Sequence, residues 1–112
     1  MQKFNSVDEL VNNIKPVDPV YCIRPNSIKL ACGWFKKRFP GKILYAVKTN
    51  PNEEVIRHIG ESGVNEFDVA SITEVKLIKK IFPKAKVYYM NTVKSREHIK
   101  DAYFNYNIRD FV

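Results

Sequence analysis

Short apolar runs alternate with amphipathic stretches along most of this sequence of 112 residues. Strand-like runs begin near Ile43, Asn65, Lys86 and Ile108. Their starts lie 22, 21 and 22 residues apart, and each intervening stretch repeats apolar residues at the spacing of a helix. Alternating strands and helices with short connections predict a parallel sheet with helical crossovers. A repeat of this length fits a (β/α)8 barrel, whose complete form needs about 250 residues.

Polar residues and glycine mark where these helices begin and end. Ser71 and Glu74 have the spacing of a capping box. Asn50-Pro51 predicts another helix start, because Asn is a good N-cap and Pro suits the first helical turn. Gly63 is placed to end the helix that follows.

The N-terminal part of the chain has a less regular pattern. A capping-box pattern near its start predicts a first helix, residues 20–23 predict a short strand, and residues 27–39 predict a second helix. Residues 1–41 would lead into residues 42–112, which would form the barrel part. Since the sequence ends inside the last strand-like run, we expect a fold truncated after about four β/α units.

Composition narrows the class of protein further. The net charge is +7, but the basic residues are spread over separate segments, which disfavours a nucleic-acid partner and suits anionic small molecules. No apolar run is long enough for a membrane span. Cys22 and Cys32 have neither metal-ligand spacing nor a disulfide framework, which favours the cytoplasm.

A lysine, Lys48, directly follows the apolar run 43–47. In α/β folds, ligands bind at the carboxyl ends of the strands. A desolvated lysine there can lose its proton and form an imine with a carbonyl compound. The simpler interpretation is an exposed lysine at a strand end. Ala46 would share a face with Lys48, and its small side chain would leave room for a ring.

The next strand ends in a second group of polar residues. Asp68 would lie at the same sheet end as Lys48, where a carboxylate can hold or orient an ammonium group. The alternative for Asp68 is an acid at a helix entry, and both interpretations stay open. Ser71 and Glu74 are better explained as a helix cap. After the third strand, turn and capping chemistry is the better explanation for Asn91.

Two motifs in this chain resemble the ornithine, diaminopimelate and arginine decarboxylases of the alanine-racemase fold. They are Tyr45-Ala46-Val47-Lys48-Thr49-Asn50-Pro51 and Phe67-Asp68-Val69-Ala70-Ser71, the second followed by Glu74. Residues 19–25 and 89–95 are similar to bacterial ornithine decarboxylases in particular. The resemblance covers nearly all of the chain from about Val17 onward.

This resemblance implies a cofactor, a reaction and a site. The cofactor would be pyridoxal 5'-phosphate, and the reaction would be decarboxylation of a basic amino acid, such as ornithine to putrescine in polyamine biosynthesis. Lys48 would be the catalytic lysine that holds the cofactor, and Ala46, Asp68 and Glu74 would line the same site. The implied fold is α/β, the N-terminal part of a pyridoxal-phosphate-binding (β/α)8 barrel.

The chain also departs from the family pattern. Members are several times longer, and their glycine-rich phosphate loop, ring-stacking histidine and acid on the pyridine nitrogen come from later strands. We therefore expect an N-terminal fragment, inactive alone, that forms homo-oligomers or associates with a C-terminal part. The alternative is a non-catalytic remnant or half-barrel module that associates with a longer partner chain. Barrel-interior residues such as Ala46 and Val69 would then face water.

Overall fold

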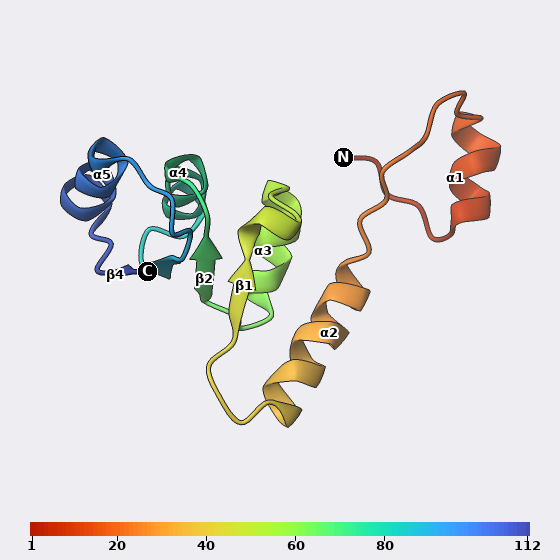
Figure 1. The fold of residues 1–112 in the computed structure, drawn as a ribbon. Helices are drawn as coiled ribbons and strands as arrows, with labels where there is room; N and C mark the ends of the chain where they lie inside the picture. Colours follow the sequence, from red (N-terminus) through yellow and green to blue (C-terminus); the bar gives the residue numbers. More distant parts are fainter.

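The computed structural model describes residues 1–112 and contains a single four-stranded sheet (Figure 1). The elements follow in the order α1 (Val7–Ile14), α2 (Pro25–Arg38), β1 (Leu44–Ala46), η1 (Val47–Thr49), α3 (Glu53–Glu61), β2 (Glu66–Val69), α4 (Ile72–Ile81), β3 (Lys86–Tyr89), α5 (Arg96–Tyr106) and β4 (Asp110–Phe111). The strands lie in chain order and all neighbours are parallel. The predicted parallel sheet with helical crossovers is therefore confirmed.

The two faces of the sheet differ in polarity. Tyr45, Phe67 and Val87 are register partners on one face, and they pack in or against the core beside α3 and α4. Leu44, Ala46, Glu66, Asp68, Lys86, Tyr88 and Asp110 alternate with the residues of that face and lie on the other, the open face, where all are at least partly exposed. Strand residues alternate between faces, so this division follows directly from the sequence.

Two expectations about exposure have different outcomes. Ala46 lies on the open face and is half-buried, as its position in the strand requires. Val69 is fully buried, so the expectation that it faces water is wrong. It is one residue after Asp68 in β2, and it therefore points toward the helices when Asp68 points away from them.

The helix ends are set by short hydrogen bonds to polar side chains. Ser71 Oγ accepts the N–H of Glu74 at 3.2 Å at the start of α4, as the capping-box spacing predicts. Gly63 follows α3 with a φ of +86°, a conformation that favours glycine. The predicted start of α3 at Asn50 is wrong. Asn52 is the N-cap, because its side chain accepts the N–H groups of Glu54 and Val55.

α1 lies away from the core, whereas α2 packs against α3 and brings Ile28 and Cys32 against the core. Figure 1 shows α1 set apart from the sheet and joined to α2 by an extended stretch. α1 buries no residue, and residues 20–23 join no sheet, so the predicted strand there is wrong. Prolines at 16 and 19 remove two backbone N–H donors from the segment between α1 and α2, which weakens the capacity of that segment to pair with a strand. No helix in the structure combines the length and hydrophobicity that crossing a membrane requires.

Candidate functional site

Lys48 lies in the middle of η1, a single 3-10 turn directly after β1. The apolar run had predicted a strand as far as Val47, but the strand ends at Ala46. Two hydrogen bonds close the turn: the N–H of Asn50 donates to the carbonyl of Val47 at 3.1 Å, and the hydroxyl of Thr49 donates to the carbonyl of Ala46 at 2.7 Å. Lys48 therefore stands at the carboxyl end of β1, as predicted, but on a turn.

The Lys48 side chain is exposed, and its amine makes no hydrogen bond or ion pair within the chain. η1 contacts β2, which carries Asp68. Asp68 is the register partner of Ala46, so the two lie side by side on the open face. Asp68 is a half-buried residue, and its carboxylate also has no hydrogen-bond or ion-pair partner in the chain.

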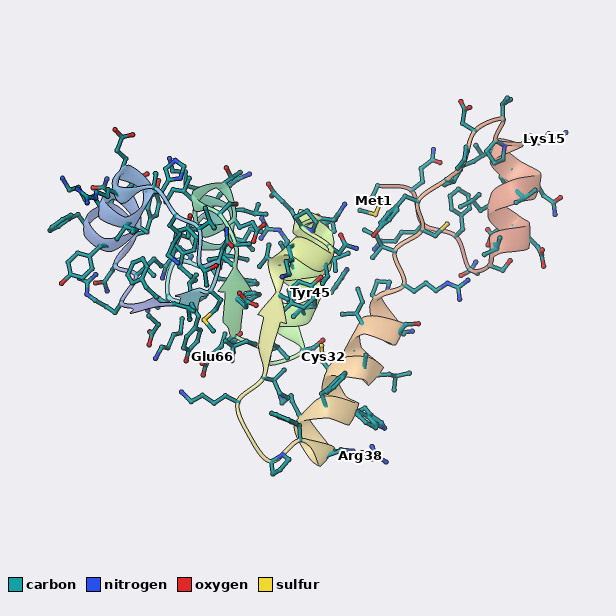
Figure 2. The ribbon with its side chains drawn as sticks, viewed as in Figure 1. Met1, Lys15, Cys32, Arg38, Tyr45 and Glu66 are labelled. Carbon is teal, nitrogen blue, oxygen red and sulfur yellow. The ribbon has the colours of Figure 1, made fainter.

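The other charged groups on the open face are paired. Tyr88 donates its hydroxyl to Glu66 at 2.5 Å, and Lys42 lies 3.7 Å from the same carboxylate. Lys86 lies 3.4 Å from Asp110, and its hydrogen bonds to Tyr88 and Asp110 raise the pKa of its amine. Figure 2 labels Glu66 at the start of β2. Asp68 is thus the one charged strand residue on this face without a partner.

Glu74 belongs to the start of α4. Its carboxylate accepts the N–H of Ala70 at 2.9 Å, while its own N–H donates to Ser71. The cap explanation for Ser71 and Glu74 is therefore confirmed. Ala70 follows β2 directly, so Glu74 fixes the strand–helix turn that comes after Asp68.

One residue of this region was missed by the sequence reasoning. Asn50, assigned above to a helix start, instead closes the turn that carries Lys48 through its backbone N–H, while its carbonyl and side chain bond Tyr45, Tyr21 and Asn52. The available signal was the pair Asn50 and Asn52 on either side of Pro51, which offers two possible caps. Only the second is adjacent to the helix.

This arrangement is a free amine and a free carboxylate at the carboxyl ends of adjacent parallel strands. The family described as "Pyridoxal-dependent decarboxylase, pyridoxal binding domain" matches residues 25–109. The chain belongs to this family. Its cofactor is therefore pyridoxal phosphate, as the resemblance implies.

A curated relative supports the same membership. The diaminopimelate decarboxylase of Aquifex aeolicus (strain VF5) is 33% identical over 86 residues, which is 75% of this chain and 20% of the relative. The chain thus spans about a fifth of the length of that relative. No solved structure gives a significant match to the chain.

The residues present fit the aldehyde end of this cofactor. An imine requires an amine that is accessible and not held in an ion pair, and Lys48 meets both conditions. The small side chain of Ala46 leaves space above the adjacent part of the open face. The starts of α3, α4 and α5 already donate N–H groups to their own caps, Asn52, Ser71 and Ser95. The fit therefore rests on Lys48, Ala46 and Asp68.

Proposed function

We propose that this chain supplies the cofactor lysine of a pyridoxal-phosphate-dependent amino-acid decarboxylase. The observation that carries the proposal is the unpartnered pair Lys48 and Asp68 at the carboxyl end of the sheet. Half-buried carboxylates in proteins are usually paired, as Glu66 and Asp110 are on the same face and Asp68 is not. A pair of groups left free there is suited to an external ligand.

Each residue has a distinct role in this proposal. Lys48 holds the cofactor through its amine, and Ala46 leaves space for the ring. Asp68 accepts a hydrogen bond from the lysine ammonium group or from the cofactor. Glu74 acts indirectly. It fixes the turn after Asp68 by accepting the N–H of Ala70. Bound pyridoxal phosphate supplies the electron sink for the carbanion that remains when carbon dioxide leaves.

We propose ornithine as the substrate, with putrescine and polyamine synthesis as the product and setting. Residues 19–25 and 89–95, which resemble bacterial ornithine decarboxylases, support this choice. A second candidate is diaminopimelate, because the Aquifex relative is a diaminopimelate decarboxylase. In either case we propose a cytoplasmic (β/α)8 barrel of the alanine-racemase type, formed with further β/α units or a partner chain.

A chimera tests the role of Lys48. In it, residues 25–109 replace the matching segment of the Aquifex diaminopimelate decarboxylase. We expect carbon dioxide release from diaminopimelate, and we expect Lys48→Ala to abolish it. Lys42→Ala is the matched control, since Lys42 lies at the opposite end of β1 and pairs with Glu66. A Lys48→Ala chimera that keeps its activity would overturn the proposal.

The substrate needs a separate assay. Protein purified from its natural source would be incubated with ornithine and with diaminopimelate in parallel. We expect faster carbon dioxide release from ornithine. A preference for diaminopimelate would overturn the ornithine assignment and leave the role of Lys48 intact.

A further inference from the structure

We propose that Asn50 is a positioning residue that holds the turn carrying Lys48 in one conformation, and that Tyr45 and Tyr21 support it. This inference rests on the proposed role of Lys48. It begins with the observation that all four polar groups of Asn50 are bonded within the chain.

The four bonds lead to different parts of the structure. The Asn50 N–H donates to Val47 within η1 at 3.1 Å. The Asn50 carbonyl accepts the Tyr45 hydroxyl from β1 at 3.1 Å. The side-chain oxygen accepts the N–H of Asn52, the cap of α3, at 3.1 Å, and the side-chain nitrogen donates to the Tyr21 hydroxyl of the N-terminal segment.

Tyr45 is the firmest of these supports. Its ring packs against the core on the helix side of β1. A half-buried ring with one bonded hydroxyl has little freedom to move. Its hydrogen bond is partly buried, so water competes with it less than at the surface. Tyr21 is 67% exposed and gives a weaker, second support.

Lys48 makes no hydrogen bond or ion pair that could orient its side chain. Its side chain is exposed and its amine is unbonded, so the position of the amine depends on the backbone conformation of η1. Reactions between positioned groups depend strongly on orientation. Loss of the Tyr45 hydroxyl should therefore slow imine formation at Lys48 while other lysines keep their rate.

The experiment compares two lysines in one molecule. The 112-residue chain is treated with limiting pyridoxal phosphate, reduced with borohydride, and mapped by peptide mass. The internal reference is Lys100, which is exposed and has no ion pair. We expect Lys48 to label several times faster than Lys100 in the natural chain, and Tyr45→Phe to lower the Lys48:Lys100 ratio about fivefold, as for one net hydrogen bond.

Tyr103→Phe is the matched control, because the Tyr103 hydroxyl makes no hydrogen bond in the chain, and it should leave the ratio unchanged. Tyr21→Phe should lower the ratio less than Tyr45→Phe. It tests the hydrogen bonds to Asn50 from a residue outside the core. A high ratio that survives both substitutions would overturn this inference and leave the proposed function standing. A ratio near one in the natural chain would also overturn this inference, whereas the proposed function is decided by the Lys48→Ala chimera.

Discussion

At the scale of single residues, function depends on which polar groups remain unpartnered. Residue type and strand position made Lys48 and Asp68 candidates, the family resemblance implied their roles, and the structure places both at the carboxyl ends of adjacent strands. The bonds around Asn50 could not be predicted in the same way. They depend on contacts with Tyr21, which is 29 residues away, and on which of two asparagines caps α3.

The capping box of α4 gives a prediction at this scale. Ser71→Ala removes the acceptor for the Glu74 N–H and should lower the free energy of unfolding by about 1 kcal/mol. Urea denaturation followed by circular dichroism measures this change. Thr73→Ala, at an exposed position in the same helical turn, should change stability by less than about 0.5 kcal/mol. Equal effects of the two substitutions would contradict the cap.

At the scale of helices and strands, the sequence predicted the part of the chain where apolar periodicity and packing agree. All four strand-like runs of residues 42–112 form strands, and α3 and α4 bury their apolar sides, whereas α5 buries only Ala102. The prediction was wrong for residues 20–23, which are apolar but pair with no strand. Apolar character alone does not place a second strand beside a segment. Strand pairing also depends on the rest of the fold.

Alanine substitutions should destabilise the chain strongly in α4, which packs on the sheet, and only weakly in α1. Ile78 of α4 is fully buried, so Ile78→Ala should cost about 2–5 kcal/mol through lost contacts and a cavity. Val11 of α1 is 47% exposed, so Val11→Ala should change stability by less than about 0.5 kcal/mol. Thermal unfolding of both variants measures this. A large effect at Val11 would show that α1 belongs to the core.

The contact between α4 and α5 should depend on pH. Hydrogen bonds from Asn105 and Lys76 lower the pKa of Asp101 in the folded chain. The resulting stabilisation is present above the unfolded pKa and is lost as the pH falls through the folded one. Asp101→Asn should therefore be less stable than the natural chain at pH 7, and the difference should vanish in acid.

Asp18→Asn is the control for that titration, because Asp18 is exposed and has no ion pair. Asp18→Asn breaks no hydrogen bond or ion pair, so its effect on stability at pH 7 should be smaller than that of Asp101→Asn. Urea midpoints at a series of pH values give both curves. A constant difference for Asp101→Asn across the acid range would contradict the proposed linkage.

At the scale of the whole molecule, the sheet leaves groups exposed that folded proteins usually cover. β1 and β4 are edge strands, and the open face beside them is only half-buried. Unpaired edges favour association with other chains. Sedimentation of the 112-residue chain should therefore show species larger than a monomer that grow with concentration. A single monomeric species with cooperative unfolding would contradict this expectation.

Catalysis should need more than these residues provide. Decarboxylation requires donors that hold the phosphate and an acid beside the pyridine nitrogen, and a single oriented polar group can contribute roughly 3 kcal/mol to a transition state. The starts of α3, α4 and α5 already bond to their own caps. We expect no measurable diamine release when the 112-residue chain is assayed alone with ornithine and pyridoxal phosphate. Measurable turnover would show that these residues form a complete site.

The central claim is that Lys48 is the lysine that holds pyridoxal phosphate. Borohydride reduction of the active chimera, followed by peptide mapping, tests it most directly. We predict one phosphopyridoxyl group on the peptide that contains Lys48, and none after Lys48→Ala. A label on a different lysine of residues 25–109, such as Lys42 or Lys94, would contradict the claim.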